Sequence, residues 1–409
     1  MGYPLFIAKR IIFNAQPSFS RFIIRLAIAA TVLSVATMII TLSLVNGFQM
    51  AVAEKVYSFW GHARVQPVNP FQTIVTDDNG FALTDTIEKE INNTSGVKSF
   101  HSFAVKSVVL KTRGQFEGVL LKGVDSRFDT TAFHRFMYSG SFFTFNDSAT
   151  YNKVVISRLT ADRLQVKQGD TIQCFFIRNG EDIRTRPMVV SGIYKTGMEE
   201  YDKNFGLADI RFLRRLNLWG DDIIGGLEIW VNHPDSSGLV ASQINQKLPI
   251  KLSCLSIGEI YPGIFEWLAI QNQTKRIVIV TMLVVAIINL ITCLLILVME
   301  RTRMVGVLKS LGMPTGQIGT IFWYYAGWIA SIGVGAGLLL GIGLCILQQT
   351  TGFIKMDEAT YYVATAPVSM DALQIGAVVI GSLLVCLFAI RLPLLYVQRI
   401  SPIRAIRFD

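Results

Sequence analysis

The residue types that carry enzymatic or metal chemistry are scattered through this sequence and form no recognised motif. The four histidines lack the spacing of metal ligands; they are His62, His101, His134 and His233. No G-x-S-x-G nucleophile motif is present. The phosphate-binding pattern G-x-x-x-x-G-K-[ST] is also absent, since the run from Gly312 to Gly316 continues into Gln317 instead of Lys. We therefore predict no catalytic residues, no metal site and no cofactor site in this chain.

Two smaller groups of residues carry weaker signals. Glu199, Glu200 and Asp202 bring three carboxylates together, and we expect a turn with solvated acids there. Cys174 and Cys254 lie in the polar middle of the chain. They could form a disulfide in an oxidising compartment, and the sequence leaves that pairing open. The other three cysteines lie in apolar blocks, where Cys behaves as a small hydrophobe.

The segment from Glu300 to Pro314 is the strongest candidate for a functional element. Val305, Leu308 and Leu311 share one helical face, at spacing i, i+3, i+6, whereas Arg303 and Lys309 lie elsewhere on the helix. Gly312 followed by Pro314 is expected to end this helix. A short amphipathic helix can anchor a loop at a membrane interface or dock into a groove of a partner. The residues alone do not separate these two roles.

The elements that must position this helix are four apolar blocks. Of the residues 51% are hydrophobic and 16% charged, against roughly 25% charged in a soluble domain. Each block has about the 20 residues that a membrane-spanning helix needs, and none contains Asp, Glu, Lys, Arg or His; they are Leu26–Asn46, Ile277–Met299, Ile318–Leu347 and Ala372–Ile390. Asn289 is strongly polar and lies deep in its block, where we expect a helix–helix hydrogen bond.

The charged flanks of the blocks predict how the chain is oriented. Lys and Arg concentrate before the first block, between the second and third, and after the fourth, which explains much of the net charge of +9 without a nucleic-acid partner. Because such residues stay on the cytoplasmic side, both termini should be cytoplasmic and residues 48–276 should lie outside. The first block is too long, and begins too late, for a cleaved signal peptide.

The outside segment is expected to fold as a mixed α/β domain. Two apolar runs flank residues 112–115, which predicts a β-hairpin. Further strands are expected at 153–156, 171–177, 187–194 and 227–231, and helices at 158–164 and 209–218.

Several motifs in fixed order resemble one known family. The run Glu300-Arg301-Thr302-Arg303 with Gly306-Val307-Leu308-Lys309-Ser310-Leu311-Gly312, placed directly after a span, resembles the coupling helix of FtsX-like ABC transporter permeases, and is most similar to the lipoprotein-releasing (LolC/LolE) family. The likeness extends along the chain, through Phe6–Arg10, Asn46-Gly47-Phe48, Gly61–Val65, Gly192–Gly197 and Ser401–Arg407.

The resemblance implies a function and its partners. Such permeases pair with a second permease, as homo- or heterodimers, and with cytoplasmic ABC ATPase subunits that hold the ATP and Mg. In the lipoprotein-releasing branch they extract lipoproteins from the inner membrane and pass them to a periplasmic chaperone. This family pattern places ATPase coupling on Arg301, Arg303, Val305, Leu308, Lys309, Leu311 and Gly312. For acyl-chain contact at the outer mouth, the candidates are the aromatic and apolar Phe48, Met50, Phe265 and Trp267, together with Asn46. Aromatic residues of a membrane-interface belt would show the same pattern.

One feature departs from the family. Members that capture the chaperone carry a proline-rich hook between two strands, but the corresponding stretch here, Arg178–Pro187, is short and holds a single proline. The chaperone step is therefore the least supported part of the implied function.

Three other functions compete with this interpretation. A MacB-like efflux permease would carry a fused ATPase, for which the 25 residues before the first block leave no room. An FtsX-like regulator of cell-wall hydrolases would usually have a smaller outside domain. A membrane receptor or adhesion module would not need the cytoplasmic helix.

The expected organisation is a four-span integral membrane protein of the bacterial inner membrane with one large periplasmic α/β domain. Its successive parts are a cytoplasmic amphipathic segment (1–25), the first span (26–47), the periplasmic domain (48–276), the second span (277–299), the coupling helix (300–317), the third span (318–347), a periplasmic loop (348–371), the fourth span (372–390) and a cytoplasmic tail (391–409).

Overall fold

The computed structural model describes residues 19–68, 80–145, 152–178 and 182–389. The chain divides into two compact units. The helical unit contains residues up to Met50, Leu268–Lys355 and residues from Thr365 onward; the sheet unit contains Ala51–Trp267 and Met356–Ala364.

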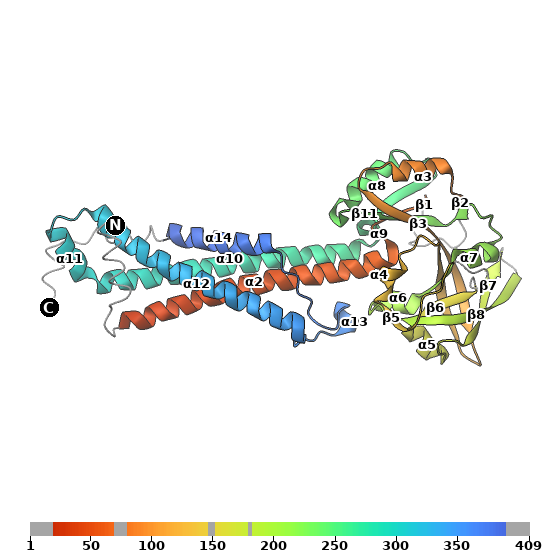
Figure 1. Ribbon diagram of the computed structural model, residues 1–409, viewed down its shortest axis with the longest axis horizontal. Helices are drawn as coiled ribbons and strands as arrows, with labels where there is room; N and C mark the ends of the chain where they lie inside the picture. Colours follow the sequence, from red (N-terminus) through yellow and green to blue (C-terminus); the bar gives the residue numbers. More distant parts are fainter. Residues whose placement is uncertain (1–18, 69–79, 146–151, 179–181, 390–409) are drawn as a thin grey trace. The chain divides into compact units, whose positions relative to one another are not determined.

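Within the described residues, five helices build the helical unit, and Figure 1 labels each of them. They are α2 (Phe19–Trp60), α10 (Pro262–Glu300), α11 (Thr302–Ser310), α12 (Thr315–Thr351) and α14 (Ala372–Ala389). Helices α2 and α10 each extend beyond their apolar block and contribute residues to both units.

Three helices in the described part of the chain, α2, α10 and α12, are long and apolar enough to cross a membrane. The fourth predicted span, 372–390, forms the shorter apolar helix α14, with residues from 390 outside the described range. The predicted count of four spans is therefore not confirmed, whereas three long apolar helices are.

Glycines on α12 allow it to pack tightly against α2. Gly333, Gly337 and Gly341 recur every four residues, so they lie along one face of the helix. A Cβ added to Gly337 would lie 2.8 Å from the Cβ of Val35 and 2.9 Å from the carbonyl oxygen of Val32. Gly335, on another face, has no neighbour within 4 Å. The backbones of α2 and α12 can approach this closely because no side chain stands between them.

Asn289 makes the helix–helix hydrogen bond that the sequence predicts. Its Nδ2 on α10 donates to the carbonyl oxygen of Ala27 on α2, at 3.0 Å. The surrounding core is apolar and includes Leu290 and Leu294 of α10. The amide therefore satisfies its polarity inside the bundle.

The sheet unit is built on a ten-stranded sheet. Its strands are β1 (Ala63–Pro67), β3 (Val97–Lys111), β4 (Phe116–Val124), β5 (Met137–Gly140), β6 (Lys153–Ser157), β7 (Thr171–Arg178), β8 (Asp182–Tyr194), β9 (Phe205–Asp209), β11 (Gly226–Val231) and β12 (Leu252–Ser256). Strands β2 (Phe81–Ala82) and β10 (Ile223–Ile224) form a separate pair. The shorter helices are α3 (Asp85–Asn92), α4 (Thr130–His134), α5 (Arg158–Leu164), α6 (Glu199–Asn204), α7 (Ile210–Asn217), the 3-10 turn Pro234–Ser236, α8 (Ser237–Asn245), α9 (Ile257–Ile260) and α13 (Glu358–Tyr361).

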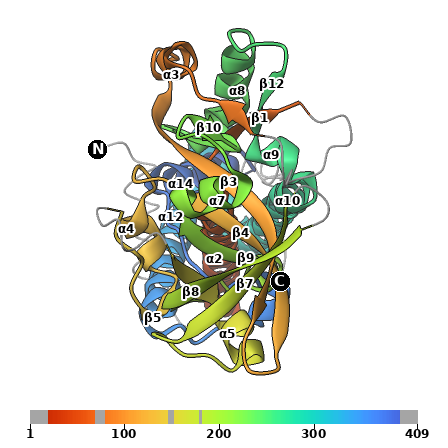
Figure 2. The same ribbon diagram turned by 90° about the vertical axis from the view of Figure 1, so that its right-hand side faces the viewer.

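Six of these strands close into a ring. The sheet runs β12-β1-β11-β3-β4-β9-β6-β8-β5, and β7 pairs with both β3 and β8. Strand β7 therefore links β8 to β3 by hydrogen bonds and closes the ring (Figure 2). Alternate residues of these strands, such as Val108, Leu110 and Leu121, belong to one buried apolar core, as a closed sheet requires.

The predicted hairpin, strands and helices of this unit are confirmed. β3 and β4 pair from Phe103 opposite Val124 to Lys111 opposite Phe116. The helix predicted at 209–218 is α7, with Asp209 accepting a hydrogen bond from the Arg211 amide as its N-cap. Cys174 and Cys254 are buried free thiols, which answers the open question of their pairing.

The contrast between Gly337 and Gly335 gives a test of the α2–α12 interface. Gly337→Ala should destabilise the protein by about 1–3 kcal/mol, because the new methyl group overlaps Val35 and the backbone of Val32. Gly335→Ala has open space and should be neutral or slightly stabilising, since Ala favours helix. Thermal unfolding of the two variants in one detergent makes the comparison. Equal midpoints would contradict a tight interface.

Candidate functional site

Helix α11 is fixed to the helical unit by its inner side chains. Val305 is fully buried, and Leu308 is half-buried against the same apolar core. That core draws on four other helices, with Ala27 from α2, Leu297 from α10, Phe322 from α12 and Cys386 from α14. A force applied to α11 would therefore reach these helices through packed side chains.

Gly312 ends α11 as the sequence predicts. Its φ of +85° is a left-handed conformation that glycine adopts readily. The Gly312 amide donates to Lys309 O at 3.1 Å and the Met313 amide donates to Leu308 O at 3.0 Å. This pair of bonds satisfies the last carbonyls of the helix, and Thr315 then begins α12.

The exposed face of α11 differs from the face that the sequence indicates. Val305 and Leu308 face the bundle, but Leu311, just past the last turn, is 77% exposed. Val307 is 49% exposed and Arg303 is exposed, so these two and Leu311 form a stripe at spacing i, i+4, i+8. Arg301 and Lys309 are half-buried at the two ends. Val307 was not predicted from the sequence, although this second periodicity indicates it.

Asn46 joins three helices at the other end of the helical unit. Its Nδ2 on α2 donates to Gln374 Oε1 on α14, at 2.8 Å, and its Oδ1 accepts from Lys275 Nζ on α10, at 2.9 Å. Gln49, one turn later on α2, donates to Leu268 O at 2.7 Å. Asn46 therefore has a structural role, because its side chain joins α2 to α14 and to α10.

The residues that follow Asn46 serve different purposes. Gly47 is buried, and a Cβ there would lie 2.8 Å from Ser369 N and closer still to Pro367 O. Phe48 is half-buried, whereas Met50 is 55% exposed. Of the three, Met50 is the most accessible to a ligand.

Phe265 and Trp267 belong to the sheet unit. The ring of Phe265 lies 5.6 Å from that of Tyr57 and packs on an aromatic core. The ring of Trp267 meets Tyr362 edge-on at 6.3 Å. Both side chains are half-buried by these contacts.

The sheet unit encloses a buried ionic cluster that was not predicted from the sequence. Lys122 and Glu228 are both inaccessible to solvent and form an ion pair at 2.7 Å. Glu228 also accepts from His101 Nε2 at 2.8 Å, and Lys122 donates to Phe59 O at the end of α2. The ring of Trp60 lies 4.4 Å from Lys122 Nζ. The signal in the sequence was a charged residue inside an apolar run, as at Lys122.

Burial and pairing shift the pKa values of this region. Burial lowers the pKa of Lys122 to about 8, although Glu228 opposes the shift. Burial would raise the pKa of Glu228, but Lys122 and His101 outweigh it and lower this pKa to about 2. Burial, helped by Lys98, lowers the pKa of His62 to about 4. The Nδ1 of His62 accepts the Val231 amide at 2.9 Å, so this ring is held neutral.

The prediction that the acids at 199–202 are solvated is wrong for one residue, Asp202. Glu199 and Glu200 are exposed, but Asp202 is buried. Its carboxylate accepts from the Thr196 amide at 2.9 Å, the Thr196 hydroxyl at 2.8 Å and the Gly197 amide at 3.1 Å. Asp202 is therefore a structural acid that shapes the 195–198 loop. No group of three or more potential metal ligands occurs within the described ranges.

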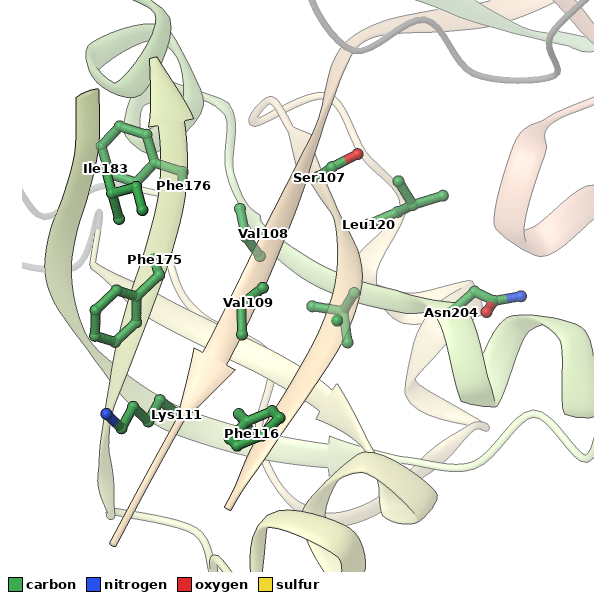
Figure 3. Close-up of a pocket in the computed structure, with 12 residues that line it drawn as sticks. Ser107, Val108, Val109, Lys111, Phe116, Leu120, Phe175, Phe176, Ile183 and Asn204 are labelled. Atoms are coloured by element: carbon green, nitrogen blue, oxygen red, sulfur yellow. The ribbon is translucent and has the colours of Figure 1, made fainter. Parts of the chain in front are cut away.

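The outer face of the strand ring carries an apolar groove of about 710 Å³ (Figure 3). Val109 of β3, Phe116 of β4, Phe175 of β7 and Ile183 of β8 contribute to its lining. Phe116 and Ile183 are each 71% exposed. The predicted hook stretch, Arg178–Pro187, falls at the end of β7 and in the first half of β8. Its residues 179–181 are outside the described part of the chain.

Long apolar helices joined to a mixed α/β unit, with a packed amphipathic helix between two of them, are typical of a membrane protein with several spans and a large domain outside the membrane. Two family profiles match: "MacB-like periplasmic core domain" over residues 26–247 and "FtsX-like permease C-terminal" over residues 276–402. The chain belongs to this family of FtsX-like permeases with a MacB-like periplasmic core domain.

Curated relatives match from end to end. The chain is 25% identical over 424 residues to the lipoprotein-releasing system transmembrane protein LolC of Haemophilus influenzae, with 100% of both chains covered. It is 22% identical to LolC of Neisseria meningitidis, covering 96% of this chain and 95% of the relative. It is also 22% identical to LolE of Haemophilus influenzae, with 98% of each covered.

Two solved structures also match part of the chain. The extracellular domain of the noncanonic ABC-type transporter YknZ from Gram-positive bacteria has 16% identity and a TM-score of 0.33, covering 47% of this chain and 98% of that one. The periplasmic region of MacB from Actinobacillus actinomycetemcomitans has 14% identity and a TM-score of 0.35, covering 49% and 91%.

The ionic cluster predicts an asymmetric response to mutation. Glu228→Gln should cost about 3–5 kcal/mol of stability, because it leaves Lys122 charged and buried without a counter-ion. The double variant Lys122→Met/Glu228→Leu should recover part of that loss, because it removes both charges but leaves Phe59 O and His101 without these partners. Denaturant unfolding of the full chain measures both. A double variant as unstable as the single one would contradict this account.

His62 should make stability depend on pH. Its pKa is about 4 in the folded protein and about 6.5 when unfolded, so the unfolded state binds more protons below pH 6.5. The contribution of His62 to the free energy of unfolding is complete above pH 6.5. It is lost as pH falls toward 4, and the loss is ~2 kcal/mol at pH 5. His62→Gln, which keeps an acceptor for Val231, should lose less stability than wild type between pH 7 and pH 5. Trp230, whose ring lies 4.9 Å from His62, provides a fluorescence signal.

Proposed function

We propose that this chain is the permease subunit of an inner-membrane ABC transporter that extracts lipoproteins for sorting to the outer membrane. In this proposal it works as a mechanotransmitter, which carries the motion of a cytoplasmic ATPase to a periplasmic domain. The observation that carries the proposal is the end-to-end match to proteins named as lipoprotein-releasing system components.

The geometry of α11 supports a coupling role. Its inner residues Val305 and Leu308 are packed into the core of the helical unit, while Val307 and Leu311 remain exposed. Exposed apolar residues on a short helix suit a groove in a partner. The basic Arg303 beside them suits an acidic rim. Motion of the docked partner would then pass to α2, α10 and α12 through the buried face.

The ATPase would be a separate subunit that supplies ATP and Mg. This chain lacks a phosphate-binding loop motif. A second permease, as a copy or a different chain, would complete the assembly. The proposed orientation across the membrane places α11 and both termini in the cytoplasm and the sheet unit in the periplasm.

The substrate end of the proposal depends on the outer ends of the helices. Met50 is exposed, and Phe48 is half-buried nearby in the chain, so these two suit an acyl chain. Asn46, Phe265 and Trp267 have structural contacts that account for their positions. Hand-over to a periplasmic chaperone is the further step, and membrane lipids are the medium from which the substrate comes.

Purification from the native membrane tests this function. The tagged full chain, extracted in more than one mild detergent, should retain a stoichiometric ATPase and bound lipoprotein, identified by mass spectrometry. An ATPase with a wall hydrolase or an outer-membrane channel would move the function to a sister branch of the family. Absence of any ATPase would contradict the transporter function and favour a receptor or adhesion role.

Substitutions on α11 test the docking face. Leu311→Asp and Val307→Asp should each abolish retention of the ATPase and leave unfolding unchanged, because both side chains are exposed. Leu239→Asp, on α8, is a matched control, since Leu239 is 72% exposed. Retention of ATPase by both α11 variants would exclude this stripe as the contact.

A further inference from the structure

The connection between α12 and α14 belongs to both units of the chain. Residues up to Lys355 and from Thr365 lie in the helical unit, while Met356–Ala364 lie in the sheet unit. The two limbs pair with each other, since Ala366 N donates to Ile354 O and Met356 N donates to Ala364 O, each at 3.0 Å. This pairing forms a two-stranded ribbon that carries α13 at its tip.

The ribbon is firmly attached at its helical end. Gln348, a buried residue near the end of α12, donates to Ala366 O at 3.0 Å and accepts from the Ile354 amide at 2.9 Å. The Ser369 amide donates to Ser43 O of α2 at 3.0 Å. Gly47 of α2 leaves room for the Pro367 backbone. Movement of α2 against α12 would therefore displace the ribbon.

Lys55 and Lys195 hold the tip within the sheet unit. Lys55 Nζ donates to two carbonyl oxygens, Tyr362 O of the tip and Thr196 O of the loop after β8, each at 2.5 Å. Lys195 forms an ion pair with Glu358 of the tip. Tyr362 also packs edge-on against Trp267. The tip is thus bound by one bridging ammonium group, one ion pair and one aromatic contact.

The surface that receives the tip is shaped for it. Asp202 fixes the 195–198 loop through its three hydrogen bonds. Gly197 has φ +74°, and a Cβ there would collide with the Glu358 carboxylate. A side chain at position 197 would therefore displace the tip.

We propose that the segment Met356–Ala364 is a tie through which movement of α2 and α12 reaches the sheet unit, with Lys55, Lys195 and Glu358 as its fastening. The proposal rests on the proposed function, because it assumes that an ATPase drives the helices. It adds a second route for that motion, separate from the continuous helices α2 and α10. A tie of this kind acts at residues 195–202, which comprise the 195–198 loop and the first residues of α6, where Asp202 connects the two.

Charge reversal gives the sharpest test. Glu358→Lys places a third ammonium group beside Lys195 and Lys55 and should release the tip, and the swap Lys195→Glu/Glu358→Lys should restore the ion pair. Glu199→Lys, on an exposed acid of α6, is the matched control. The measurement is hydrogen exchange of residues 195–202 in the full chain, purified with its ATPase, with and without ATP.

Wild type and Glu199→Lys should show an ATP-dependent change in exchange at these residues. Glu358→Lys should reduce that change by about threefold, in line with an exposed ion pair, while exchange in β6 stays the same and shows that the fold is intact. The swap should restore the change. A full ATP-dependent change in Glu358→Lys would overturn the tie, and so would its absence in wild type. Because no lipoprotein takes part in this readout, failure to find lipoprotein substrate would leave the result valid.

Discussion

The way in which α2 ends is the constraint on which the sheet unit depends. The last carbonyl groups of a helix have no partners within it, and here they must be satisfied in a buried setting. Gly61, with φ +70°, turns its amide back to Tyr57 O at 2.7 Å, and Lys122 supplies a donor to Phe59 O. The amide of the next residue, His62, donates to Ile229 O of strand β11 at 2.8 Å. The end of the helix and the start of the sheet are thus one continuous hydrogen-bonded structure.

A charged donor at this position has consequences for the whole core. The C-terminus of a helix carries partial negative charge, which favours a cation, and the Trp60 ring adds a further favourable contact. Burial makes that cation costly, so Glu228 must balance it, and His101 must in turn satisfy Glu228. Strands β3, β4 and β11 each contribute one of these residues. Their alignment is therefore set by the ionic cluster as well as by apolar packing.

Much of the fold could be predicted from the sequence, and the failures have physical causes. The apolar blocks correctly predict helices and the apolar runs of the outside segment correctly predict strands, because the pattern of apolar residues along each segment reflects its burial directly. The role of Asn289 followed from the cost of an amide in an apolar setting. Asp202 was misjudged because its partners are backbone amides, which the sequence does not identify. Val307 was missed because the sequence shows two apolar faces on α11, and only the packing of Val305 reveals which one remains exposed. The buried pair of Lys122 and Glu228 joins residues more than a hundred positions apart, which no local pattern reports.

The closed ring of strands has a consequence for how this family can vary. Because β7 is hydrogen-bonded to β3 on one side and to β8 on the other, the ring is closed by the strands themselves and does not depend on the residues that join β7 to β8. Residues inserted between Arg178 and Asp182 would leave every one of these strand pairings in place. Related chains can therefore differ in the length of this connection, and gain or lose a recognition element there, at small cost to folding.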